Sequence, residues 1–167
     1  MEQKYNLPQT EEQLTKLLDN FYETTKTKLS NNEKPKFKGL LEIISSDVVI
    51  ITAIHNIKSN AGSRTPGSDA MVIDDILRKK YDEVVDLVKE NLQNYKPKEV
   101  RRVWIEKPGK KEKRPLGIPT IVDRIVQESV RIVIEPILEA QFFEHSYGFR
   151  PMRDTHMAIK RIKTVIH

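Results

Sequence analysis

The chain has 167 residues, which indicates one domain or a few small subdomains rather than a multidomain protein. Its 29 Lys and Arg residues outnumber its 24 Asp and Glu residues, and the formal net charge of +5 permits binding to nucleic acid or to an acidic membrane surface. The absence of cysteine excludes disulfides, thiolate zinc sites and cysteine nucleophiles. Because residues 1–6 hold no apolar signal core and the longest apolar run covers only residues 48–51, the sequence predicts a soluble, cytoplasmic protein without a membrane segment.

The N-terminal half is predicted to be helical. Residues 8–28 form a first helix, because apolar side chains recur at i, i+3 and i+4 spacing: Leu14, Leu17, Leu18, Phe21 and Tyr22. A polar linker at 30–36 and a short amphipathic helix at 37–44 follow. The β-branched residues of 48–57 favour a strand, but their helical spacing and the capping residues Ser46 and Asp47 favour a helix, which we prefer. A loop at 60–69 leads to a long helical pattern over 72–95 with a break near Tyr81.

The pattern changes at Glu99, where extended segments at 100–105 and 114–119 flank a turn at 108–113 and predict a β-hairpin with a basic tip. A helix begins at Thr120, with Asp123 as the second member of a capping box, and runs to about His145 with Pro136 kinking or dividing it. A last helix begins near Arg153 or Asp154 and continues to His167. No Gly, Asn or Pro closes it, so we expect the chain to be cut from a longer protein. The predicted fold class is α+β and mainly helical.

The densest basic segment covers residues 96–114, which hold nine Lys or Arg residues against three Glu. Such a cluster suits phosphate binding, and a solvated surface hairpin is the equally ordinary alternative. The adjacent pair Asp74–Asp75 lies in the first turn of a predicted helix, where acids stabilise the helix end, so we favour a structural role over metal binding. The four histidines lack metal-ligand spacing, and no phosphate-binding or nucleophile motif is present. The residues alone display no complete active site.

Three strings in a fixed order resemble a known family. RRVWIEKPGKKEKRPLGIPTIVDRIVQ at 101–127, and SYGFRP at 146–151 followed by Arg153 and His156, resemble the first sequence blocks of group II intron-encoded reverse transcriptases, also called maturases. The upstream string at 60–69, from Asn60 to Asp69, is similar to the extra N-terminal block of that family. The resemblance covers roughly residues 37–167.

The resemblance implies the fingers of a right-hand polymerase, with the palm absent or truncated. Residues 1–35 would be an N-terminal helix and linker, 36–98 a helical N-terminal extension, and 99–167 the fingers, with the hairpin at 99–119 and helices at 120–145 and 153–167. The catalytic, metal-binding aspartates of the family are expected beyond His167, so no catalytic and no metal-binding residue is assigned to this chain. The parent enzyme would be an RNA-directed DNA polymerase that uses Mg²⁺ and dNTPs, and the fragment alone is expected to be inactive.

The sequence departs from the family pattern in the first strand. The family commonly has Ile-Pro-Lys there, whereas this chain has Ile105-Glu106-Lys107, which retains the lysine and adds a negative charge. The string at 72–75 ends in Asp74-Asp75 but does not substitute for the palm motif, because it lacks the aromatic residue and precedes the fingers.

The family's basic fingers residues contact the incoming nucleotide, and the matching positions here are Arg102, Lys107 and Arg114. Residues implied to contact template or intron RNA are Asn60, Gly62, Arg64, Lys110, Lys111, Lys113, Gly117, Ile118, Phe149 and Arg150. Basic residues around the linker are implied to contact intron RNA as well: Lys26, Lys28, Lys34, Lys36 and Lys38. Each of these positions also has an alternative without RNA contact. The linker and hairpin tip could be solvated surface, Gly117 could form a tight turn, and Phe149 could be a structural aromatic residue that anchors its loop.

The implied partners are group II intron RNA, an RNA template and a DNA primer in a bacterial cytoplasm, with a homodimer left open and no membrane. The implied function is RNA-directed DNA synthesis coupled to intron splicing and mobility. Two alternatives remain: a non-catalytic RNA-binding splicing cofactor, and a retron-like or CRISPR-associated reverse transcriptase.

Overall fold

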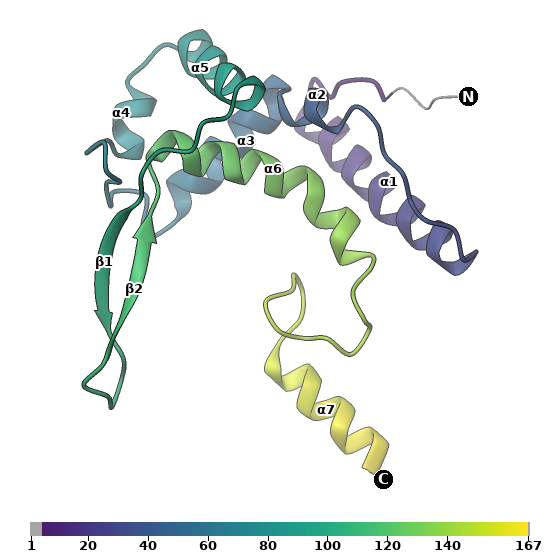
Figure 1. Cartoon of the computed structure of the whole chain (residues 1–167). Helices are drawn as coiled ribbons and strands as arrows, with labels where there is room; N and C mark the ends of the chain where they lie inside the picture. The colour runs from purple at the N-terminus through teal and green to yellow at the C-terminus, as the bar shows by residue number, and fades with distance from the viewer. Residues whose placement is uncertain (1–4, 167) are drawn as a thin grey trace.

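The computed structural model describes residues 5–166; residues 1–4 and 167, at the ends of the predicted segments 1–35 and 153–167, lie outside the described residues. Seven helices and one antiparallel pair of strands form the described part (Figure 1). In chain order they are α1 (Glu11–Ser30), α2 (Leu40–Ile44), α3 (Asp47–Ser59), α4 (Ile73–Leu77), α5 (Tyr81–Gln93), β1 (Arg101–Glu106), β2 (Lys113–Ile118), α6 (Ile121–Glu139) and α7 (Thr155–Ile166). The predicted α+β, mainly helical class is confirmed.

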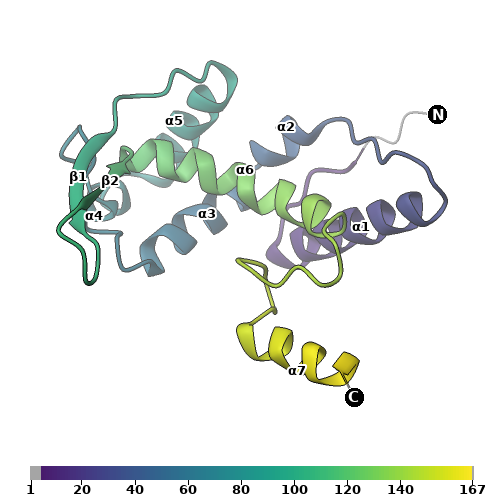
Figure 2. The ribbon, with the colours of Figure 1, turned by 60° about the horizontal axis from the view of Figure 1, so that its bottom comes forward.

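Helix α6 is the centre of the helical body, and it contacts α1, α2, α3 and α5 (Figure 2). Its buried face carries apolar side chains at helical spacing, among them Ile121, Ile125 and Val133. These side chains meet the buried residues of α3 and α1, such as Ile50 and Phe21. We call this contact between the buried faces of α6, α3 and α1 the apolar seam. Each fully buried aliphatic side chain contributes roughly 1.5–3 kcal/mol to the stability of the fold, so the apolar seam holds the N-terminal helices to the segment that follows the hairpin.

The ambiguous segment 48–57 is helical, as α3. Its residues Val49, Ile50 and Ala53 are fully buried on the face toward the core, so helical spacing prevails over β-branched composition. The Ser46 side chain forms no capping bond to α3, because its hydroxyl donates to the Ile43 carbonyl instead. The predicted break near Tyr81 is confirmed, since α5 begins at that residue.

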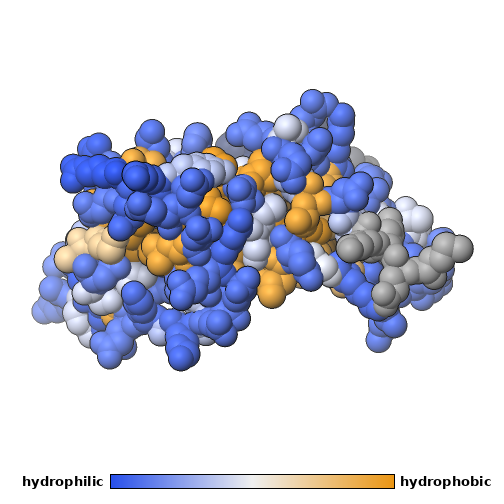
Figure 3. Space-filling view, turned by 90° about the horizontal axis from the view of Figure 1, so that it is seen from above, coloured by the Kyte–Doolittle hydropathy of each residue, from blue (hydrophilic) through white to orange (hydrophobic). Residues whose placement is uncertain are grey.

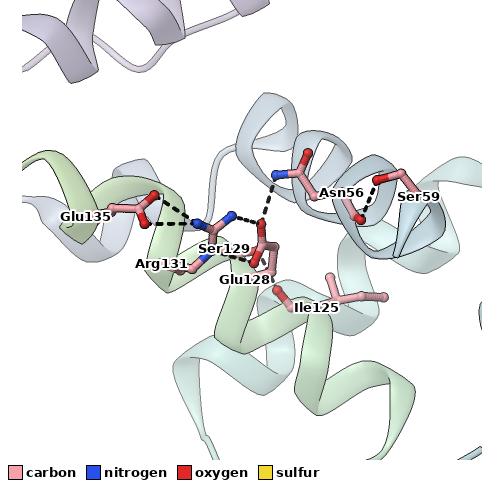
Figure 4. Close-up of polar contacts among 7 residues, drawn as sticks. All are labelled: Asn56, Ser59, Ile125, Glu128, Ser129, Arg131 and Glu135. Atoms are coloured by element: carbon pink, nitrogen blue, oxygen red, sulfur yellow. Dashed lines mark hydrogen bonds and ion pairs between the residues drawn. The ribbon is translucent and has the colours of Figure 1, made fainter. Parts of the chain in front are cut away.

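A polar bridge joins α3 to α6 beside the apolar seam (Figure 4). The Asn56 amide donates to Glu128 Oε1 at 2.8 Å, and Arg131 donates to both Glu128 oxygens at 2.6 and 2.8 Å. Arg131 also reaches Glu135 on the next turn of α6, at 2.9 Å. The bridge therefore helps to set which faces of α3 and α6 meet.

Helix α6 starts as predicted and ends earlier than predicted. The Thr120 hydroxyl accepts from the Asp123 amide and donates to the Asp123 carboxylate at 2.7 Å, which caps the first turn. The helix contains Pro136 without being divided there, and it ends at Glu139 rather than near His145. The early end follows from Arg150, which bonds to Glu139 and to two loop carbonyls and so holds residues 140–150 as a loop.

The hairpin and α7 extend from this body in both ribbon views (Figures 1 and 2). Gly109, with φ of 72°, lies in the turn that joins the two strands. Helix α7 buries none of its residues. Seen from above, hydrophilic residues cover most of the surface, and hydrophobic ones show between them along the middle (Figure 3). No helix among residues 5–166 has the length and apolar content needed to cross a membrane.

Candidate nucleic-acid interface

The pairing of β1 with β2 sorts the hairpin side chains onto two faces. Directly paired residues point to the same side of an antiparallel ribbon, and the sides alternate along each strand. We call one side the Arg114 face; its members are Arg101, Val103, Ile105, Lys107, Arg114, Leu116 and Ile118. We call the other side the Trp104 face; its members are Val100, Arg102, Trp104, Glu106, Lys113, Pro115 and Gly117.

The three predicted nucleotide contacts are therefore divided between the faces. Lys107 and Arg114 share the Arg114 face, because the Lys107 amide donates to the Glu112 carbonyl and continues the ladder past Ile105 and Arg114. Arg102 lies on the Trp104 face, opposite Gly117. Lys107 and Arg114 can thus approach one phosphate group from the same side of the hairpin. Arg102 points to the opposite side and cannot join them there.

The Arg114 side chain forms no hydrogen bond or ion pair with any of the described residues, whereas its backbone pairs with Ile105. The two glutamates that could have braced it have other partners: Glu112 pairs with Lys107 at 3.3 Å, and Glu106 pairs with Lys113 at 3.7 Å. These exposed pairs are worth at most about 1 kcal/mol each, so a phosphate could displace them at little cost. Lys110 and Lys111 at the tip are exposed, and their side chains likewise lack partners within residues 5–166. The tip is thus a set of cations available to an anion.

The base of the hairpin is tied to the 60–69 loop. Arg124 of α6 donates to the carbonyls of Gly62, Thr65 and Pro119 at 3.0, 2.6 and 3.0 Å. Arg101 donates to the Pro66 carbonyl at 2.9 Å, and its strand thereby joins the same cluster. Burial lowers the pKa of Arg124, although the guanidinium stays charged at any physiological pH.

Two further contacts tighten this junction. The Ser68 hydroxyl donates to the Glu99 carbonyl at 2.6 Å. A Cβ on Gly67 would lie 2.6 Å from the Pro119 carbonyl oxygen, so the two backbones approach as closely as only glycine allows. The loop that resembles the family's extra N-terminal block is therefore in direct contact with the exit of the hairpin.

The predicted RNA contacts of this loop lie at its exposed side. Asn60, Gly62 and Arg64 are all exposed, and the Arg64 side chain pairs with Asp74 at 3.2 Å. Asp75 accepts from the Val72 amide at 3.0 Å, so both residues of the Asp74–Asp75 pair have structural partners. Gly117 and Ile118 lie at the end of β2, where Gly117 is exposed and Ile118 half-buried.

The second predicted RNA loop is organised around Arg150. Its side chain is only 6% exposed and donates to Glu139 and to the carbonyls of Phe143 and Ser146. The bond to Glu139 raises the pKa of the Arg150 guanidinium above its already high ordinary value. Phe149 is fully exposed with φ of 57°, so Arg150 holds the loop while Phe149 projects from it.

The predicted linker cations are spread along α1 and the following segment. Lys26 lies over the Tyr22 ring with 5.6 Å between Nζ and the ring centroid, and Lys28 pairs with Glu33. Lys34, Lys36 and Lys38 are exposed. Their RNA contacts, like those of the loops, stay predictions.

Sequence reasoning missed the roles of Arg124, Arg101 and Trp104. Arg124 and Arg101 donate to main-chain carbonyls far away in the chain, which no side-chain pattern reveals. Trp104, the single tryptophan, is 57% exposed on its strand, whereas the strand pattern suggested only a hairpin. No group of three or more His, Asp or Glu side chains among residues 5–166 is arranged to hold a metal ion.

Comparison with known proteins finds that part of this chain is similar to group II intron-encoded proteins and intron maturases. Group II intron-encoded protein LtrA of Lactococcus lactis subsp. cremoris is 40% identical over 127 residues, which is 76% of this chain and 21% of LtrA. Protein YkfC of Escherichia coli (strain K12) is 37% identical over 130 residues, 77% of this chain and 34% of YkfC. Nuclear intron maturase 1, mitochondrial, of Arabidopsis thaliana is 41% identical over 46 residues, 28% of this chain and 6% of that protein. No protein-family model matches the chain.

Proposed function

Since this chain is homologous, over 76% of its length, to a part of group II intron-encoded proteins, we propose that it forms the N-terminal extension and fingers of a reverse transcriptase–maturase. The chain spans about one fifth of LtrA, so the activity belongs to the complete protein. In this proposal, the complete protein that contains this chain would copy RNA into DNA and take part in splicing and mobility of its intron. The word maturase in the names of the Arabidopsis relatives supports the splicing role.

The observation that supports this proposal best is the position of Lys107 and Arg114. They share one face of the hairpin, and the Arg114 side chain has no partner among the described residues. A triphosphate carries several anionic oxygens, which a forked guanidinium binds in pairs and an ammonium binds as a point charge. We assign these two side chains to the incoming dNTP.

RNA binding is assigned to the exposed cations at the tip and to the loop at the base. Lys110 and Lys111 offer unpaired charge, and the 60–69 loop presents Asn60 and Arg64 beside the hairpin. Because Arg124 joins loop and hairpin, one RNA strand can contact both without a change in their relative position. Phosphate contacts of this kind give affinity and position rather than sequence specificity.

The Mg²⁺ ions of such a polymerase are not assigned to this chain. The described residues contain no cluster of acidic or histidine side chains that suits a metal, so no step of the proposal passes through a metal held here. The contribution of residues 5–166 is to hold RNA and to position nucleotide phosphates.

A non-catalytic splicing cofactor is the second candidate, and the relatives named as intron maturases favour it to the same degree. It would use the same basic surface for RNA and would have no need of Arg114 as a nucleotide contact. The two candidates therefore differ at Arg114.

The test uses an enzyme that contains this chain together with a palm. Arg114→Ala should lower kcat/KM for dNTPs, because a charge-assisted contact to the triphosphate is lost. The decrease should correspond to a loss of about 2–4 kcal/mol of transition-state stabilisation. Arg114→Lys should recover only part of the loss, since an ammonium cannot bind two oxygens in a fork. Arg102→Ala is the matched control on the opposite face and, with template RNA at saturating concentration, should leave dNTP kinetics nearly unchanged. Normal dNTP kinetics in Arg114→Ala would contradict the assignment, and the absence of any RNA-directed DNA synthesis would favour the splicing cofactor.

A further inference from the structure

Trp104 is the only tryptophan of the chain, and it lies in the middle of the Trp104 face with 57% of its surface exposed. A tryptophan can bury about 150–250 Å², so leaving it in water forgoes a large stabilisation. Nothing in the dNTP assignment uses it, because that assignment depends on the other face of the hairpin.

Trp104 lies beside a proline on the neighbouring strand. It pairs with Pro115, and because proline has no N–H, this pair occupies a position of the ladder without hydrogen bonds. The bond from the Lys107 amide to the Glu112 carbonyl, three positions along, agrees with this alternation. In such pairs the side chains are closest, so the indole and the pyrrolidine ring form adjacent parts of one surface.

Glycine extends this surface toward the base of the hairpin. Gly117 has no side chain, and a Cβ there would lie 3.2 Å from Val100 Cγ2, so the Val100 side chain lies beside it. Val100 is itself 51% exposed. The Trp104 face thus carries the apolar residues Val100, Trp104 and Pro115, with Arg102 between Val100 and Trp104 along the chain; we call these three apolar residues the strip.

Cations border the strip on both strands. The Arg102 side chain has no hydrogen-bond or ion-pair partner among residues 5–166, and the Lys113 side chain makes only the exposed ion pair with Glu106 at 3.7 Å. The hairpin segment 101–114 carries seven basic and two acidic residues. An exposed aromatic ring between cations is the arrangement with which proteins bind single-stranded nucleic acid, stacking a base and holding the flanking phosphates. A protein partner would need a larger apolar area than this strip offers.

We propose that Trp104 stacks on an unpaired base of RNA while Arg102 and Lys113 hold the phosphates on either side of it. This inference rests on the proposed RNA-binding function and adds to it a second contact surface, on the side of the hairpin away from the nucleotide contacts. Double-stranded RNA is not the ligand, because its bases are already stacked and paired.

The test exploits the single tryptophan, whose intrinsic fluorescence reports on this position alone. An unstructured single-stranded RNA oligonucleotide is titrated into the full chain, and binding is followed in parallel by the anisotropy of a label on the RNA. Tryptophan fluorescence should be quenched in proportion to binding. The same RNA as a duplex, and polyphosphate of matched charge, should bind without comparable quenching. Equal quenching by polyphosphate would overturn the proposal.

Variants supply the second arm. Trp104→Ala should lower affinity for the single strand by about 5- to 150-fold, the range for losing one base–aromatic stack, and Trp104→Phe should keep most of the affinity. Leu116→Ala removes an apolar side chain that is 47% exposed on the Arg114 face and should change affinity less than about twofold. Circular dichroism verifies that each variant is folded. Unchanged affinity in a folded Trp104→Ala variant would refute the stacking role alone, whereas wild-type protein that binds no RNA would refute the proposed function as well.

Discussion

At the residue scale, Glu128 shows how a charged side chain is kept near the core. Its side chain is only 11% exposed, and both oxygens accept hydrogen bonds from Arg131, with a third bond from Asn56 of α3. The bonds from Arg131, and then that from Asn56, lower the pKa of Glu128, while burial works in the other direction. The carboxylate is therefore held in its charged form, and it joins two helices that are far apart in the sequence.

The lowered pKa of Glu128 predicts a loss of stability in acid. Because the pKa in the folded state lies below the ordinary value of 4.5, the ionised form contributes stability above that value, and the contribution is lost as the pH falls through the folded pKa. Glu128→Gln should lower stability at neutral pH by about 1–3 kcal/mol and should weaken the decline of stability in acid. Thermal melting across this pH range measures both effects.

Glu12→Gln is the control for this prediction. Glu12 pairs with Lys16 on the exposed side of α1, where such a pair contributes less than about 1 kcal/mol. If Glu128→Gln and Glu12→Gln showed the same acid dependence as the wild type, the bridge between α3 and α6 would have no electrostatic role.

At the scale of elements, the hairpin depends on its base. A two-stranded ribbon alone is marginally stable in water, and β1 and β2 pair only with each other. Arg101 and Arg124 anchor the ribbon to the 60–69 loop through main-chain carbonyls, and Gly67 lets the two backbones touch. The tip extends from this junction with the side chains of Lys110 and Lys111 unpaired among the described residues, so rigidity at the base positions their charge.

Gly67→Ala should separate the loop from the hairpin. The new Cβ would lie 2.6 Å from the Pro119 oxygen and 2.7 Å from Thr120 Cα, and these backbone atoms cannot turn aside as a flexible side chain would. We expect a loss of about 1–3 kcal/mol in unfolding free energy and faster hydrogen exchange at the amides of 60–69. Gly62→Ala, in the same loop but with no atom within 4 Å of its Cβ, is the matched control. Equal stability of the two variants would show that the close approach has no structural importance.

Much of this fold follows from local patterns, and what does not follow depends on distant partners. The apolar stripe of α1, the break at Tyr81 and the basic hairpin were all predictable, because periodicity and turn residues act over a few positions. The end of α6 was not, since it is set by Arg150, eleven residues beyond Glu139. The resemblance pointed to Lys107 and Arg114, but only strand register shows that they share a face and that Arg102 does not.

At the scale of the whole molecule, the described part combines a helical body with exposed basic and apolar surfaces. The hairpin extends from one end of α6, and α7 follows its other end (Figure 1). Helix α7 exposes an apolar stripe, formed by Ile159, Ile162, Val165 and Ile166, and buries nothing. The net charge of +5 and the cations of the hairpin together favour a polyanionic partner over a neutral one.

The central claim, that the hairpin tip grips RNA phosphates, is tested most directly by the salt dependence of RNA binding. The wild-type chain should bind structured RNA with an affinity that falls steeply as the salt concentration rises. In a plot of the logarithm of the binding constant against the logarithm of the salt concentration, each single-strand phosphate contact contributes about −0.7 to the slope. Lys110→Glu with Lys111→Glu should weaken binding and reduce that slope by about 1.4, because two contacts are lost. Lys160→Glu with Lys163→Glu, which makes the same change of charge on α7, should leave the slope nearly unchanged. Tight binding that is indifferent to salt, or an equal effect of both double variants, would contradict the account.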